Sequence, residues 1–257
     1  MRHATQKILV GLASLTLVDI AVAVAADLPV KAPPKPTYNW SGFYVGAHAG
    51  YRSGDANFSG PGYIFDPGIG PVAFPGRSET YRPNGAIAGV QGGYNFMITP
   101  KILAGIEGDW TWGSGRAGAI GGFSINANDS FSFVSQTRLA WQSTIRGRLG
   151  VVNGPWLFYG TGGVAFTRVN WSDTSTWTVF GTPTAFSSSN VGSTLTGAAV
   201  GVGFEYMCNP NWIARLEYLY ESFGKVSVPF GLGPQTGTLD LRDVNKVRAG
   251  ISYKFNQ

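Results

Sequence analysis

The chain has 257 residues, of which 44% are hydrophobic and 14% aromatic but only 13% charged, against roughly 25% charged residues in soluble domains. This composition disfavours an ordinary soluble surface. The 37 glycines follow no three-residue period, which excludes collagen, the single cysteine excludes an intramolecular disulfide framework, and the net charge of +5 includes no basic run that would follow a nucleic-acid backbone.

The first 26 residues have the three parts of an export signal. Basic residues near the N-terminus precede an apolar run over residues 8–18, and small residues at 23–26 precede Asp27. The run is shorter than the about 20 residues that a membrane-spanning helix needs, and Asp19 would be costly at the centre of such a helix. We therefore predict that residues 1–26 are a cleaved signal peptide.

The next segment, residues 27–38, reads DLPVKAPPKPTY and contains four prolines. Proline at this density forbids a helix and favours an extended, solvated chain. We predict a periplasmic tether here, followed by one folded domain over residues 39–257.

The folded part alternates between apolar and polar residues instead of containing long apolar runs. In residues 101–112, isoleucines and tryptophans share one face of an extended strand, and Glu107 and Asp109 share the other. The same two-residue period recurs over 138–151, 212–220 and 246–255. The pattern predicts strands with one apolar and one polar face. The segment 157–169 is apolar and rich in glycine on both faces, so its alternation allows either facing.

Turn signals separate these strands at a regular interval. Prolines at 100, 155 and 210, each beside Thr, Gly or Asn, predict tight turns 55 residues apart. Between them lie longer segments rich in Gly, Ser, Asn and Pro, which we predict to be long loops: 53–83, 113–135, 172–193 and 224–240. Four units of strand, long loop, strand and short turn give eight antiparallel strands.

Eight strands of about ten residues, with short turns at one end and long loops at the other, are typical of an outer-membrane barrel. The predicted fold class is therefore all-β, an eight-stranded antiparallel up-and-down transmembrane β-barrel. Tryptophans near the short turns (Trp40, Trp156, Trp212) and near the long loops (Trp110, Trp112, Trp171) fit the two membrane interfaces. A soluble exported β-sandwich also alternates, but it would need more surface charge.

Several strings in this order resemble one known family. They are NWSGFYVGAHAG (39–50), GVQGGYNF (89–96), GIEGDW (105–110), IRGRLGVV (145–152), FYGTGGVAF (158–166), WIARLEYLYESFG (212–224) and VRAGISYKF (247–255). Together they resemble the small porin-like outer-membrane barrels of alphaproteobacteria, the RopB-type relatives of the OmpA transmembrane domain. That family usually ends on an aromatic residue, whereas Asn256 and Gln257 follow Phe255 here.

The resemblance implies a location and partners. A protein of this kind lies in the cell outer membrane of a Gram-negative bacterium, with its N-terminus in the periplasm and its long loops outside the cell. It is surrounded by outer-membrane lipid and lipopolysaccharide, and the barrel-assembly machinery inserts it. The loop predicted at 53–83 either contacts such surfaces or serves as a passive lid.

The polar faces of the predicted strands place charges inside the barrel. On this facing assignment the lumen receives Glu107, Asp109, Arg138, Arg146, Arg148, Glu205, Arg215, Glu217, Glu221, Lys246, Arg248 and Lys254. An eight-stranded barrel is just wide enough for side chains to fill, and buried charges persist when they are paired. We therefore expect a salt-bridge network that plugs the lumen and a structural role in envelope integrity. A small diffusion porin, with a slight anion preference from two spare bases, is the alternative.

Catalysis has little support in the sequence. Downstream of residue 26 the chain has one histidine, His48, and no GxSxG or HExxH motif. The string at 113–118 matches G-x-G-x-x-G but is followed by AIGGFS, which does not predict a helix. A lipid-modifying enzyme would need His48 beside a serine and an acid at the lipid face. We expect no enzymatic activity, no cofactor and no nucleic-acid partner.

Overall fold

A computed structural model of the chain describes residues 38–66, 68 and 70–255. The predicted signal peptide, all but Tyr38 of the predicted tether, and the residues after Phe255 lie outside the described residues. Within the described part, no helix is long and apolar enough to cross a membrane.

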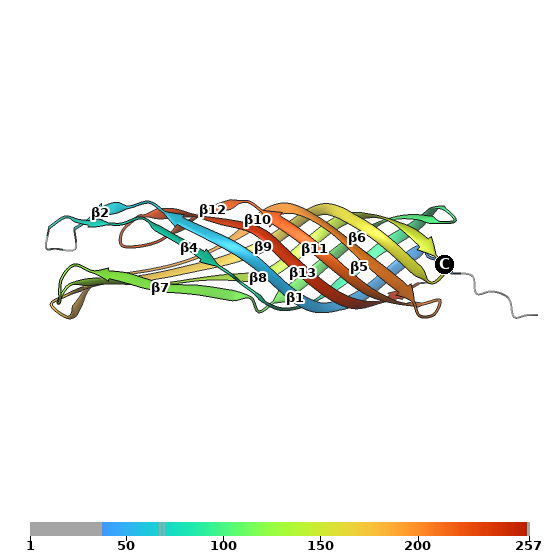
Figure 1. Cartoon of the computed structure of the whole chain (residues 1–257), viewed down its shortest axis with the longest axis horizontal. Coiled ribbons are helices and arrows are strands. Elements are labelled where there is room, and N and C mark those ends of the chain that lie inside the picture. The colour runs from blue at the N-terminus through green and yellow to red at the C-terminus, as the bar shows by residue number, and fades with distance from the viewer. Residues whose placement is uncertain (1–37, 67, 69, 256–257) are drawn as a thin grey trace, which may run out of the picture. The chain divides into compact units, whose positions relative to one another are not determined.

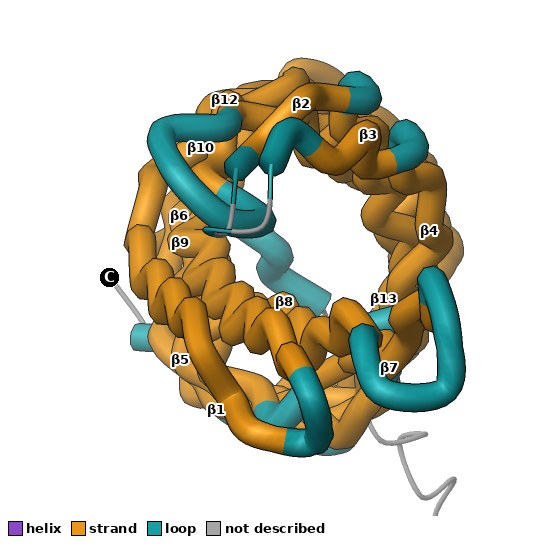
Figure 2. Tube along the Cα trace, turned by 90° about the vertical axis from the view of Figure 1, so that its left-hand side faces the viewer, coloured by secondary structure: helices purple, strands orange, loops and turns teal. Residues whose placement is uncertain are grey.

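Eight strands form a closed ring (Figures 1 and 2). In chain order they are β1 (Gly42–Gly60), β5 (Gly85–Thr99), β6 (Ile102–Gly113), β8 (Ser130–Asn153), β9 (Trp156–Val179), β10 (Thr182–Met207), β11 (Trp212–Phe223) and β13 (Thr236–Lys254). Each strand pairs antiparallel with the next, and β13 pairs back with β1 from Tyr44 opposite Lys254 to Ser59 opposite Thr238. The predicted eight-stranded antiparallel barrel is confirmed.

The three short turns lie where the prolines predict them. Thr99–Lys101 joins β5 to β6, residues 153–156 join β8 to β9, and residues 207–212 join β10 to β11. Asn209 closes the last turn because its side-chain carbonyl accepts hydrogen bonds from the backbone of Asn211 (3.0 Å) and Trp212 (2.9 Å). All three turns lie at the end of the barrel that carries the C-terminus (Figure 1).

The segments predicted as long loops are largely strands, which corrects that prediction. At 172–193, β9 and β10 continue outward to a two-residue turn at Phe180 and Gly181, whose φ angles are 49° and 74°. Two consecutive positive φ values are typical of a hairpin turn that matches the twist of the strands. The segment was predicted as a loop from its Gly, Ser, Asn and Pro content, but it also contains threonine, which favours strands when its neighbours alternate.

The other three predicted loops also contain paired strands. The short β2 (Tyr63–Phe65) and β3 (Val72–Phe74) pair with each other, and β4 (Arg77–Tyr81) pairs with the outer part of β1. In the same way β7 (Arg116–Ser124) pairs with β8, and β12 (Lys225–Pro229) pairs with β13. These elements form the extension at the end opposite the short turns (Figure 1).

A β-bulge in β8 reverses the facing that simple alternation predicts. Leu139 pairs with Val169 on β9 but Gln142 pairs with Thr167, so β8 contains one extra residue between these two pairs. An extra residue moves every later side chain to the opposite face. As a result Leu139 is fully buried inside the barrel and Arg138 is exposed on its outer surface, so the prediction that Arg138 faces the lumen is wrong.

The outer surface is apolar between two levels of aromatic side chains. Isoleucines, valines and leucines around the ring are about half exposed, as lipid-facing residues are, and Trp110 and Trp112 lie at one level with Trp156 and Trp212 at the other. Trp40 and Trp171 were predicted to join these levels, but each is 1% exposed. Both occupy inward positions of the alternation, so they fill the interior.

Candidate functional site in the barrel interior

The inward faces of the strands gather most of the predicted charges. Eleven of the twelve predicted side chains are buried inside the barrel, and Arg138 is the exception. Arg52, which was not predicted, is fully buried and donates hydrogen bonds to Gln142 (2.9 Å) and to the Leu139 carbonyl (3.3 Å). Its sequence position offered a signal, because Arg52 continues the inward alternation that begins at His48.

Four arginines and four acids occupy the centre of the interior: Arg146, Arg148, Arg215, Arg248, Glu107, Asp109, Glu205 and Glu217. Their side chains are at most 2% exposed. Register brings many of them together, since directly opposite residues on neighbouring strands lie close in space. Glu107 is opposite Arg146 and Glu217 is opposite Arg248. Each of these cross-strand pairs combines an acid with a base.

Two arginines bridge acids from different strands. Arg146 contacts Glu107 at 2.7 Å, Asp109 at 3.0 Å and Glu217 at 3.1 Å. Arg248 contacts Glu217 at 2.6 Å and Asp109 at 3.0 Å. Arg248 also lies 3.7 Å from Glu107, so the two guanidinium groups share all three carboxylates. Sharing satisfies more donors and acceptors than an isolated pair, which favours retention of the charges in a dry interior.

The other two arginines share acids in the same way. Arg215 contacts Glu107 at 2.5 Å and Glu205 at 2.7 Å, and Arg148 contacts Glu205 at 2.8 Å. Two tyrosines extend the network: Tyr44 donates to Glu107 at 2.6 Å, and Tyr159 donates to Glu217 at 2.9 Å. The Arg148 guanidinium also lies 4.1 Å from the centre of the Tyr159 ring. Charges and aromatic groups together fill this level.

A second polar layer lies next to the central charges, on the side of the extension. Lys246 contacts Glu221 at 2.6 Å, and Gln142 donates to the same carboxylate at 3.0 Å. His48 is also buried, with Nδ1 2.5 Å from Gln91 Oε1 and Nε2 3.0 Å from Thr111 Oγ1. Both ring nitrogens therefore have polar partners inside the barrel.

Lys254 lies near the short turns. It is 1% exposed, and its ammonium group lies 3.4 Å from the Ser41 carbonyl. This lysine therefore lies between the arginine network and the end of the barrel that is predicted to face the periplasm.

Apolar layers lie on both sides of these charges. The inward residues of β8 read Leu139, Gln142, Thr144, Arg146, Arg148, Gly150 and Val152 in order. Val152 packs with Trp40, Leu103 and Leu157 near the short turns. Leu139 packs with Phe58, Tyr81, Trp171 and Phe230 on the other side, where the Phe58 and Trp171 rings stack at 5.0 Å.

The extension contains a third polar cluster that the sequence analysis missed. Arg77 contacts Asp173 at 3.0 Å and donates to Ser135 at 2.6 Å, and its guanidinium lies 3.4 Å from the centre of the Phe133 ring. The Gly231 backbone also donates to Asp173 at 3.0 Å. All of these residues except the half-buried Phe133 are buried. They were missed because this region was predicted as loops, for which no facing was assigned.

The geometry offers little for chemistry on a substrate. The G-x-G-x-x-G string at 113–118 lies at the junction of β6 and β7, so no helix follows it. Among the described residues, no group of three or more His, Cys, Asp or Glu side chains is arranged to hold a metal ion. The interior instead holds matched charges, hydroxyl groups and apolar layers.

The chain matches a family model and several relatives over most of its length. A family model for the outer membrane protein β-barrel domain matches residues 20–255. The chain is 31% identical to the 31 kDa outer-membrane immunogenic protein of Brucella melitensis biotype 1, over 95% of this chain and 98% of the relative. It is 27% identical to the 22 kDa outer membrane protein of Rhizobium leguminosarum bv. viciae, over 88% and 82% of the two chains. A solved structure, OprG from Pseudomonas aeruginosa, matches with 18% identity and a TM-score of 0.45, covering 84% of this chain and 97% of OprG.

Proposed function

This chain belongs to the outer membrane protein β-barrel domain family, and from that premise we propose that it is a closed structural barrel that supports the integrity of the outer membrane and shapes the cell surface. Membership of this family confirms the resemblance found in the sequence. It also confirms that the protein lies in the cell outer membrane. In the proposed orientation the short turns face the periplasm, and the extension with β2, β3, β4, β7 and β12 faces outward.

The observation that carries this proposal is the shared pairing of charges at the centre of the interior. Arg146 contacts three carboxylates, and Arg248 contacts the same three. A permeating ion would have to separate such partners, and removing one partner from a buried pair costs about 3 to 5 kcal/mol. The apolar layers around Trp40 and Trp171 add dry barriers on both sides. These features support a barrel that does not conduct.

A small diffusion porin is the alternative function. Porins in larger barrels have water between their lining charges, whereas an eight-stranded interior is filled by side chains. Seven bases and five acids still lie inside, because Arg52 takes the place that Arg138 was predicted to have. This excess of positive charge would favour anions if a path opened. The depth of burial of these groups supports the closed barrel over the porin.

Single-channel recording separates the two functions. We expect no current steps from protein folded in planar lipid bilayers in simple salt, with folding verified by heat-dependent gel migration. Reproducible steps that vanish or change ion selectivity on Arg146→Gln or Arg148→Gln would overturn the closed barrel. The matched control is Arg138→Gln, which removes the same charge from the outer surface.

An enzymatic role is not part of this proposal. The lipid-modifying alternative needs His48 at the lipid face beside a serine and an acid. His48 is 4% exposed and lies between Gln91 and Thr111 in the interior. Its surroundings support a structural polar contact.

We also propose that the barrel-assembly machinery inserts the protein into the outer membrane.

A further inference from the structure

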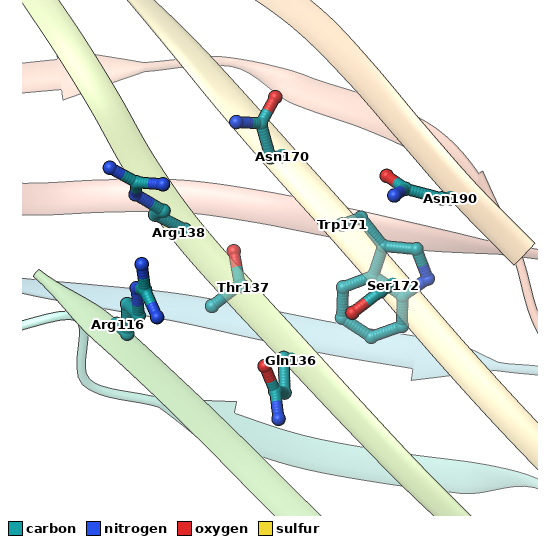
Figure 3. Close-up of a pocket in the computed structure, with 8 residues that line it drawn as sticks. All are labelled: Arg116, Gln136, Thr137, Arg138, Asn170, Trp171, Ser172 and Asn190. Carbon is teal, nitrogen blue, oxygen red and sulfur yellow. The ribbon is translucent and has the colours of Figure 1, made fainter.

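The outer surface carries a basic patch on one side of the barrel, formed by Arg116, Arg138 and Arg168. Arg116 on β7 lies directly opposite Arg138 on β8, and Arg138 lies opposite Asn170 on β9. Figure 3 shows the two arginines side by side, with Asn170 and Asn190 on the neighbouring strands. These residues line a cavity of about 350 Å³ together with Gln136 and Ser172. Arg168 lies on β9, two residues before Asn170, and is also exposed.

The patch lacks the acid partners that two other exposed arginines have. On the other side of the barrel, Arg82 contacts Asp55 at 3.3 Å and Arg242 contacts Asp240 at 2.9 Å. Within the described part of the chain, no carboxylate pairs with any arginine of the patch. Like charges directly opposite each other on a sheet destabilise it. The pairing of Arg116 with Arg138 therefore leaves a positive site that an anion would relieve.

The patch lies at a particular height on the barrel. Trp112 on β6 is opposite Trp141 on β8, and Trp141 stacks on Trp110 with ring centres 4.6 Å apart. Arg138 precedes Trp141 by three residues on β8. It therefore lies roughly 10 Å along the strand from Trp141, toward the extension. Interfacial tryptophans lie at the level of lipid headgroups. The arginines are thus just outside the apolar band, where the charged groups of outer-leaflet lipid lie.

The backbone leaves room for this arrangement. A Cβ atom at position 192 would lie 2.6 Å from Arg168 Nη2 and 2.9 Å from Asn170 Oδ1, closer than real contacts allow. Gly192 lies opposite Asn170 on β10. A larger side chain there would displace the Arg168 guanidinium or Asn170, so glycine permits their present positions over β10.

We propose that this patch binds the anionic headgroups of outer-leaflet lipopolysaccharide, with Arg116 and Arg138 clamping one phosphate group. Guanidinium groups suit phosphate because they donate two parallel hydrogen bonds to it. Asn170 and Asn190 line the same cavity and supply further amide donors for the sugar that carries the phosphate. The acyl chains of the lipid would extend along the apolar band past Trp110 and Trp141. The proposal depends on the outer-membrane location and not on the closure of the lumen.

A lipid titration tests the site. Protein purified from outer membranes in a zwitterionic detergent is mixed with lipid A bearing two phosphates, with the same lipid after its phosphates are removed, or with inorganic phosphate. The readout is the denaturant midpoint of unfolding, because a ligand that binds the folded state raises it. We expect the phosphorylated lipid to raise the midpoint and the other two additives to have little effect.

Variants locate the effect. Arg116→Gln with Arg138→Gln should weaken the apparent affinity for the phosphorylated lipid roughly 25-fold, or about fivefold for each arginine. The matched control, Arg82→Gln with Arg242→Gln, removes the same charge from the other side and should retain the wild-type affinity. Without lipid, the patch variant should unfold at the wild-type midpoint or above it, since it relieves repulsion.

Three results would overturn the proposal. One is equal binding of phosphorylated and dephosphorylated lipid, and another is equal loss of affinity in the control variant. The third is a rise with inorganic phosphate that matches the rise with lipid at the same phosphate concentration, which would make the patch a small-anion site. None of these results bears on the conductance of the interior, so the two proposals fail independently.

Discussion

Glu217 on β11 lies directly opposite Arg248 on β13, and their side chains meet at 2.6 Å in the buried interior of the barrel. Arg146 contacts the other oxygen of the same carboxylate at 3.1 Å. One acid thus holds two guanidinium groups from strands on different sides of the lumen. The stability of the central network depends on such shared carboxylates.

Removal of that shared charge should destabilise the folded barrel. We expect Glu217→Gln to lower the free energy of unfolding by about 3 to 5 kcal/mol, because two buried arginines lose a common partner. The measurement is the urea midpoint of unfolding in lipid vesicles. Asp240→Asn is the control, since its partner Arg242 is exposed at the surface and the pair should contribute less than about 1 kcal/mol. Equal midpoints for Glu217→Gln and the unaltered protein would show that the network is not stabilising.

The bulge in β8 and the inward facing of Arg52 on β1 predict opposite thiol reactivity at positions 138 and 52. In a Cys208→Ser background, Arg138→Cys should react with a polar maleimide in the folded state, because position 138 faces outward. Arg52→Cys should react only after unfolding, since Arg52 is fully buried. Reaction rates in detergent, with the folded fraction measured by heat-dependent gel migration, decide this. Slow labelling at 138 together with fast labelling at 52 would reject the observed register.

The polar cluster around Arg77 and Asp173 should stabilise the extension without affecting the eight-stranded ring near the short turns. Asp173→Asn weakens the contact with Arg77 and the hydrogen bond from the Gly231 backbone. We expect faster hydrogen exchange in β4 and around residue 230, with local stability lowered by about 3 kcal/mol. Exchange in β11 should not change. Asp55→Asn is the control because its pair with Arg82 is exposed, and an equal effect there would argue against a special role for Asp173.

The turn of the β9–β10 hairpin provides a test of orientation. Phe180 is 79% exposed at the tip of the β9–β10 hairpin, so a short epitope inserted between Phe180 and Gly181 should be tolerated. Antibody should bind it on intact cells. The same epitope between Gly154 and Pro155, at a short turn, should be reached only after the outer membrane is permeabilised. The reverse pattern would invert the proposed orientation.

Alternation in the sequence was sufficient to predict the ring of strands and most of the inward charges. Side chains of a strand point to opposite faces with a period of two, so Glu107 and Asp109 could be placed together, as could Lys246 and Arg248. Turn-forming prolines near 100, 155 and 210 marked the strand ends because proline and its neighbours favour tight turns. Both signals are local, and local patterns are visible in one sequence.

The tertiary structure decided the features that depend on neighbouring strands. The bulge between Leu139 and Gln142 appears only in the pairing of β8 with β9, and it moves Arg138 to the surface. The serine- and threonine-rich segment at 172–193 becomes a strand hairpin because its residues find partners across β8, β9 and β10. Both features depend on pairing with a neighbouring strand.

The sequence by itself determined the eight-stranded barrel and the polarity of its two faces, whereas the choice of partners inside it required the closed ring. Closure of β13 on β1 sets the stagger of all strands, and that stagger brings Arg146 from β8 to Glu217 on β11. It also decides that Trp171 stacks on Phe58 in the interior and does not lie at the lipid interface. Alternation specifies the face of each side chain, and only the register of the whole ring specifies what that side chain meets.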